Sequence, residues 1–187
     1  MKRLRLGLAA LALPAITATL VGIDARMAEP AARFQRLPAT PWLVLDRQLG
    51  LVWQRCPRGT QLVDDAKQPQ CTGKPERFLA QPAEWEAQRL STPRETWRLP
   101  DVRELSSLID DRRCCHALDP IAFPVFGVPD DGAWGGRTYP FHTATPHSQS
   151  DERWRVESLE GEVLPALVRA RGLLRLVRTA TPQEMAR

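Results

Sequence analysis

The chain has 187 residues, of which 43% are hydrophobic and 26% are charged, a composition typical of an ordinary globular protein. Its formal net charge is +4, but four of its 26 basic residues and one of its 22 acidic residues fall within residues 1–28, which leaves 22 basic and 21 acidic residues. Nonspecific binding to nucleic acid or to a membrane surface needs a basic field, so the near-neutral remainder argues against both roles.

Residues 1–28 have the pattern of an export signal. Three basic residues precede an uncharged run over residues 6–23 that is rich in alanine and leucine. A basic flank followed by such a run predicts a signal peptide or, if it is not cleaved, a signal anchor. We therefore expect an exported protein, periplasmic, surface-bound or secreted, whose only link to a membrane is an uncleaved leader. Residues 29–40 are expected to be a linker.

Residues 42–46 and 51–54 are short apolar segments separated by a turn that ends in Gly50. Because glycine adopts positive φ without steric cost, this pattern predicts a strand, a turn and a second strand. Trp53 lies in the second segment, and we expect it in the core.

Cys56 and Cys71 bracket a loop rich in proline, glycine and aspartate, which has few apolar side chains to bury. In an oxidising compartment a bridge between them would close this loop and stabilise the fold by about 3 kcal/mol in the chain-entropy model. Four cysteines allow three complete pairings, however. The competing arrangement pairs Cys56 or Cys71 with Cys114 or Cys115.

Two short helices are predicted in the middle of the chain. Residues 81–90 have a proline near the first turn, and we expect Trp85 to anchor this helix in the core. An extended entry then leads to the second helix through Trp97, Arg98, Leu99 and Pro100. Asp101 and Glu104 have the spacing of a capping box, which places the start of this helix. Apolar residues recur on one face of it as far as residue 110: Val102, Leu105, Leu108 and Ile109.

The segment Cys114-Cys115-His116 follows this helix and carries the most reactive side chains in the sequence. The adjacent cysteines can form a vicinal disulfide or each pair elsewhere. Together with His142 and His147 they are a candidate zinc set, but the spacing does not match a closed tetrahedral site. No third residue can be assigned to a cysteine and histidine nucleophilic pair. We therefore expect structural cysteines, with no metal and no cofactor.

The second half of the chain is predicted to contain strands and long loops. Strands are expected over residues 141–145, 154–159, 163–168 and 173–178. Pro165 places the third of these at a sheet edge, and residues 180–187 are expected to be a tail. A glycine-rich loop surrounds Trp134, which would suit stacking on a sugar ring if exposed; the alternative is that it folds back over the core.

The Trp97-Arg98-Leu99-Pro100 segment and the helix start at Glu104-Leu105 resemble the signature of the Lcl C-terminal domain family. Further segments resemble the family in the same order along the chain: Leu49 to Gln54, Trp85 with Ala87, Leu118-Asp119-Pro120, Phe123-Pro124, Trp154-Arg155-Val156, Gly161 and Leu174 to Arg178. The resemblance covers residues 41–179. The chain departs from the family where relatives usually read Tyr-Trp-Ser-Ser and it reads Phe141-His142-Thr143-Ala144.

The order of the predicted elements indicates one α+β domain. The family resemblance implies a C-type-lectin-like fold, in which a twisted antiparallel sheet carries two short helices and long loops after an N-terminal signal segment. It also implies a place on the bacterial cell surface, adhesion to sulfated polysaccharides and assembly into a homo-oligomer.

These features favour a non-enzymatic binding or adhesion module of the bacterial envelope or surface, with a glycan or protein partner and no nucleic acid. Aromatic rings stack on sugars and guanidinium groups bind sulfate or carboxylate, so four residues are candidates for ligand binding: Trp134, Arg137, Arg153 and Arg155. The alternatives are a cysteine- or zinc-dependent enzyme that uses Cys114-Cys115-His116, and a structural component of an envelope or pilus assembly.

Overall fold

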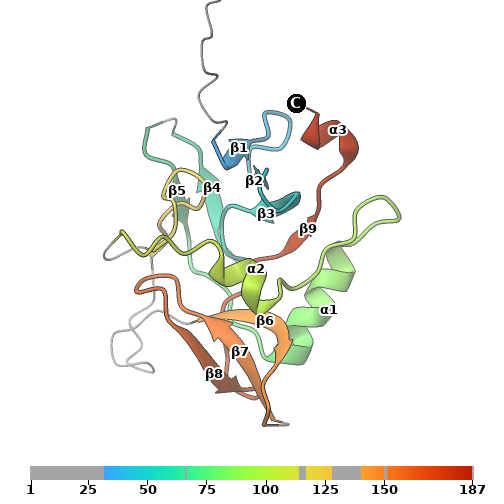
Figure 1. Ribbon diagram of the computed structural model, residues 1–187, viewed down its shortest axis with the longest axis vertical. Helices are drawn as coiled ribbons and strands as arrows, with labels where there is room; N and C mark the ends of the chain where they lie inside the picture. Colours follow the sequence, from blue (N-terminus) through green and yellow to red (C-terminus); the bar gives the residue numbers. More distant parts are fainter. Residues whose placement is uncertain (1–31, 66, 114–116, 128–139, 150, 187) are drawn as a thin grey trace, which may run out of the picture. The chain divides into compact units, whose positions relative to one another are not determined.

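The computed structural model describes residues 32–65, 67–113, 117–127, 140–149 and 151–186 (Figure 1). The expected signal segment, residues 1–28, lies outside them. In the described residues the elements follow in the order β1 (Phe34–Arg36), β2 (Leu43–Asp46), β3 (Leu51–Gln54), β4 (Gln61–Val63), β5 (Gln70–Thr72), α1 (Ala80–Leu90), α2 (Val102–Ser106), β6 (Phe141–Pro146), β7 (Glu152–Val156), β8 (Val163–Leu167), β9 (Val177–Thr179) and α3 (Pro182–Met185).

The strands form antiparallel sheets, which together with the helices make an α+β fold. One sheet has the order β1-β2-β3-β9, a second pairs β4 with β5, and a third has the order β6-β7-β8. The strand β8 lies at the edge of its sheet, as Pro165 predicted. Among the described residues no helix is both long enough and apolar enough to cross a bilayer.

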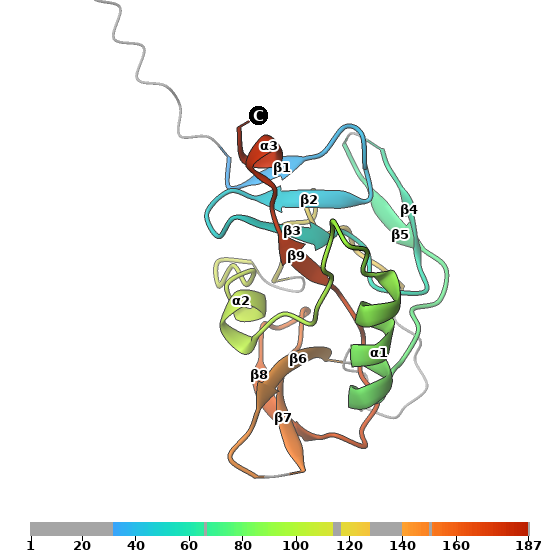
Figure 2. The same cartoon turned by 90° about the vertical axis from the view of Figure 1, so that its right-hand side faces the viewer.

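The hairpin of β2 and β3 is the centre of the four-stranded sheet and confirms the prediction for residues 42–46 and 51–54. Leu43 pairs with Gln54, and Gly50 closes the turn with a φ of 63°. Because β1 pairs with β2 and β9 pairs with β3, both strands of the hairpin are inner strands of the sheet (Figure 2). Trp53 is fully buried, as expected.

Two flanking segments, the expected linker and the expected tail, contain regular structure among their described residues. Residues 29–40, the expected linker, contain β1, and the ring of Phe34 in this strand lies 5.1 Å from that of Phe123 in the core. The expected tail, residues 180–187, contains α3, whose capping box joins Thr181 and Glu184. The packing of Phe34 against Phe123 stabilises β1, and the capping box stabilises α3, a helix of four residues. The composition of the two segments indicates neither element.

The helix α2 begins where the sequence predicts. Asp101 accepts a hydrogen bond from the backbone of Glu104, whose carboxylate in turn accepts one from the backbone of Asp101. The helix is shorter than expected and ends at Ser106; a turn continues to Ile109. Its apolar face packs against β6 and β7, so the amphipathic pattern is confirmed.

The helix α1 matches the predicted residues 81–90 but not the predicted anchor. It buries Ala83 and Ala87, whereas Trp85 is 56% exposed. Small side chains let the helix backbone approach the core closely, and the helix therefore turns its bulkiest residue outward. The expectation that Trp85 anchors α1 in the core is wrong.

Candidate functional site

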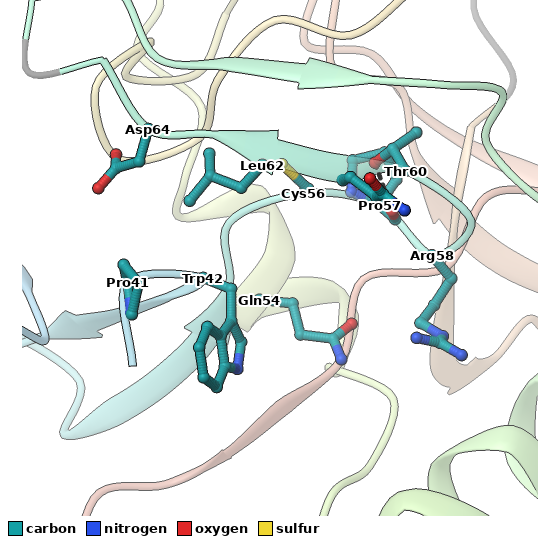
Figure 3. A pocket seen from close by; sticks show the side chains of 10 residues that line it. Pro41, Trp42, Gln54, Cys56, Pro57, Arg58, Thr60, Leu62 and Asp64 are labelled. Atoms are coloured by element: carbon teal, nitrogen blue, oxygen red, sulfur yellow. Dashed lines mark hydrogen bonds between the residues drawn. The ribbon is translucent and has the colours of Figure 1, made fainter. Parts of the chain in front are cut away.

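A hollow of about 350 Å³ lies where β2 begins, β3 ends and β4 runs past both. We call it the Trp42 hollow; its side chains include Trp42, Gln54, Arg58, Gln61, Leu62 and Asp64. In Figure 3, Trp42 and Gln54 lie on one side of it, with Leu62 and Asp64 from β4 and its end on the other. Its volume is at the lower end of the range for small-molecule sites.

A disulfide between Cys56 and Cys71 holds the β4 side of the Trp42 hollow. The prediction of this bridge is confirmed, and Cys56 itself lines the hollow. The bridge ties the chain just after β3 to β5, which pairs with β4. Residues 57–64 therefore return to the same place although they bury little apolar surface of their own.

The side chain of Arg55 is fully buried and hydrogen-bonds to Pro41 and Asp64, which line opposite sides of the Trp42 hollow. Its Nη1 donates both to the carbonyl of Pro41 at 2.7 Å and to Asp64 Oδ1 at 2.8 Å. The remaining guanidinium nitrogens donate to the carbonyls of Ile121 at 2.8 Å and Ala122 at 3.3 Å. Arg55 therefore sets the spacing between the chain before Trp42 and the end of β4.

The groups that the Trp42 hollow offers to a ligand are neutral. The indole of Trp42 is 55% exposed, and its Nε1 donates to no group in the described residues. Gln54 Oε1 accepts a hydrogen bond from the backbone of Leu176 at 3.3 Å, which orients the amide and leaves its Nε2 as a donor. Gln61 on β4 adds a second exposed amide. An apolar ring beside amide donors is suited to a polyhydroxylated ligand.

The charged groups of the Trp42 hollow are already paired. Arg58 Nη2 donates to Glu86 Oε1 on α1 at 2.5 Å. Both oxygens of Asp64 are used, one by Arg55 at 2.8 Å and the other by Arg36. Although burial of its carboxyl opposes the effect, the hydrogen bonds from Arg55 and Arg36 lower the pKa of Asp64. Its carboxylate therefore stays ionised and paired at neutral pH.

The residues expected to bind a ligand are not brought together in the described residues. Trp134 and Arg137 lie outside them. Arg153 forms an ion pair with Glu84 on α1. Arg155 is fully buried and donates to backbone carbonyls of the β8 end, including that of Ala170 at 2.6 Å. Because both of its terminal nitrogens donate to backbone carbonyls, this buried guanidinium positions backbone and does not face a ligand.

Three members of the candidate zinc set, Cys114, Cys115 and His116, lie outside the described residues. His142 is buried, and its Nε2–H donates to the carbonyl of Phe78 at 2.7 Å. Burial and the nearby charge of Arg155 lower the pKa of His142 to about 4, so its imidazole is neutral at neutral pH. Among the described residues no cluster of three or more histidine, cysteine or carboxylate side chains could hold a metal ion.

The motif residues before α2 have structural roles. Trp97 and Leu99 are buried in one core cluster and Leu105 in another. Arg98 donates through both terminal nitrogens to Glu104, at 2.6 and 2.7 Å, and so fastens the extended entry to the first turn of α2. Pro100, also buried, ends that entry, and its carbonyl accepts a hydrogen bond from β6.

Sequence reasoning missed the Trp42 hollow. Trp42 was included in the predicted strand 42–46, whereas the structure begins β2 at Leu43 and leaves Trp42 exposed just before it. The opposing side comes from the disulfide loop, and the pairing of these two segments is not visible in the sequence.

The comparisons with known proteins give one match. The family model described as the Lcl C-terminal domain matches residues 42–178. Neither the curated proteins nor the solved structures include a match to this chain. The matched range contains both longer helices, the disulfide and every residue that lines the Trp42 hollow except Pro41.

Proposed function

Because the chain belongs to the Lcl C-terminal domain family, we propose that it is an exported, non-enzymatic binding module of the bacterial envelope or surface that recognises a saccharide in the Trp42 hollow. The observation that carries this proposal is the exposed indole of Trp42 beside the oriented amide of Gln54 and the exposed amide of Gln61. The expectation of a ligand at Trp134 and Arg137 is separate from this proposal, since both residues lie outside the described residues.

Saccharide rings have one apolar face and a rim of hydroxyl groups. The indole can cover the apolar face, as aromatic rings commonly do at binding sites, while Gln54 and Gln61 hydrogen-bond to the rim. A space of about 350 Å³ suits one or two sugar rings at the end of a glycan. This geometry favours recognition of a terminal or exposed sugar over enclosure of a whole chain.

Two features support export to an oxidising compartment. Disulfides such as Cys56–Cys71 are typical of proteins of the periplasm, the cell surface or the medium, and residues 1–28 have the pattern of a leader. We also propose the C-type-lectin-like arrangement that the family resemblance implies; antiparallel sheets, short helices and long connections support it.

The test compares two tryptophan variants on a glycan array and by titration calorimetry. Trp42→Ala should weaken binding of any glycan hit at least about tenfold, because a central aromatic contact is a typical hot spot. Trp85→Ala is the matched control: Trp85 is 56% exposed and Trp42 55%, but Trp85 lies outside the Trp42 hollow. Equal losses in both variants, or no glycan bound by the wild type, would refute the proposal.

A further inference from the structure

We infer that the Trp42 hollow selects an uncharged saccharide, and that Glu86 on α1 is the residue that sets this selectivity. The inference rests on the proposed function and adds the chemical class of the ligand. It differs from the sulfated polysaccharide that the family resemblance implies.

The charged side chains that line the Trp42 hollow are one arginine and one aspartate, which balance. Asp64 has no oxygen left for a ligand cation, since Arg55 and Arg36 each take one. Its carboxylate in turn occupies Arg55 and Arg36, and the remaining donors of Arg55 are held by backbone carbonyls. A sulfate or carboxylate that enters between β4 and Trp42 would therefore meet no free guanidinium on that side of the hollow.

Glu86 decides whether Arg58 can act as such a guanidinium. Its Oε1 accepts hydrogen bonds from Arg58 Nη2 at 2.5 Å and from Arg89 Nη2 at 2.8 Å. The hydrogen bonds from Arg89, with those from Arg58, lower the pKa of Glu86 against the opposing effect of burial. The carboxylate is therefore charged at neutral pH, and it holds Arg58 toward α1 and offsets part of its charge.

The groups that remain free are those that a neutral sugar needs. The Trp42 indole and the Gln54 and Gln61 amides carry no charge, so binding through them releases no counterions and depends little on salt. An anionic glycan that reaches Arg58 would instead have to compete with Glu86, whose side chain is largely shielded from solvent.

The test uses the whole exported chain and two sets of probes. The neutral probes are uncharged oligosaccharides of glucose, galactose, mannose and N-acetylglucosamine; the anionic probes are heparin-derived oligosaccharides and oligogalacturonate. Titrations at about 20 mM and about 200 mM NaCl separate steering by charge from contact with a neutral ligand. We expect a neutral probe to bind with less than about a twofold change between the two salt concentrations.

Glu86→Gln should give the protein affinity for the anionic probes, by about tenfold and mainly at low salt, because it frees the charge of Arg58. The double variant Glu86→Gln with Arg58→Gln should lose that gain. Glu84→Gln is the matched control: it removes the same charge from α1 at a residue whose partner is Arg153, outside the Trp42 hollow. It should not give any affinity for anions that Arg58→Gln abolishes.

Each result either supports or overturns this selectivity. If the wild type binds only anionic probes and Trp42→Ala abolishes that binding, the inference is wrong and the proposed function stands. If no probe of either set binds, the proposed function fails as well. If Glu86→Gln melts at the wild-type temperature but gains no affinity for the anionic probes, the role of Glu86 is refuted. If Glu86→Gln unfolds, the double variant Glu86→Gln with Arg58→Gln, which lacks both charges, must still bind neutral probes more tightly than anionic ones.

Discussion

Replacement of Arg55 by methionine should destabilise the protein far more than replacement of Arg36, although both arginines bind the same carboxylate of Asp64. Arg55 is fully buried, whereas the side chain of Arg36 is 37% exposed. Methionine fills the space of the aliphatic part of the arginine, so the difference between the variants reports on the guanidinium contacts.

The magnitude follows from the contacts of Arg55. Its guanidinium donates to three carbonyls besides Asp64, those of Pro41, Ile121 and Ala122. Removing one partner of a buried charge pair and stranding buried acceptors costs about 3–5 kcal/mol. An exposed pair is worth about 1 kcal/mol or less, which is the expected loss for Arg36→Met.

Urea unfolding of both variants measures this difference. At a slope of about 2 kcal/mol per molar, Arg55→Met should lower the midpoint by about 2 M and Arg36→Met by less than about 0.5 M. The fold lowers the pKa of Asp64. The stabilisation from its ion pairs is therefore present above the pKa of about 4 that it has in the unfolded chain, and is lost as pH falls through its pKa in the folded protein. The difference in urea midpoint between the wild type and Arg55→Met should therefore become smaller in acid. Equal midpoint shifts for the two variants would refute the clamp role of Arg55.

Three further predictions concern parts of the fold outside the Trp42 hollow. The hydrogen bonds from Arg178 lower the pKa of Glu184 to about 2, so α3 should stay docked at neutral pH and lose hydrogen-exchange protection as pH falls from about 4 toward 2; Glu184→Gln should lose that protection already at neutral pH. Burial lowers the pKa of His142 to about 4, so the unfolded chain binds the extra proton first, and the free energy of unfolding should fall by about 3 kcal/mol between pH 6.5 and 4; His142→Gln should flatten this slope in chemical denaturation. Gly161→Ala should lower the melting temperature more than Gly50→Ala: both glycines have positive φ, but only at Gly161 would a Cβ approach another side chain, at 2.8 Å.

Local patterns in the sequence predicted the elements well where the pattern and the packing agree. The capping pair Asp101 and Glu104 placed the start of α2, and two short apolar segments on either side of the turn at Gly50 placed the β2–β3 hairpin. The disulfide between Cys56 and Cys71 followed from the short loop that it closes, since bridging neighbours in the chain needs little long-range information.

The side chains that make the candidate site were not predictable in the same way. Trp85 and Trp42 have the same side chain, yet one was expected in the core and the other was given no role, and both are exposed. Exposure depends on which surface an element turns to its neighbours. For α1, the small side chains of Ala83 and Ala87 settled that question.

By itself, the sequence determined the α+β class, the start of each longer helix, the central hairpin and the family to which the chain belongs, because these depend on residues close together in the chain. Only the tertiary structure decided that Arg55, a residue usually exposed, lies buried beneath the Trp42 hollow. A guanidinium can be buried only where carbonyls and a carboxylate from distant segments converge on it. Here they come from residues 41, 64, 121 and 122, and only folding brings those positions together.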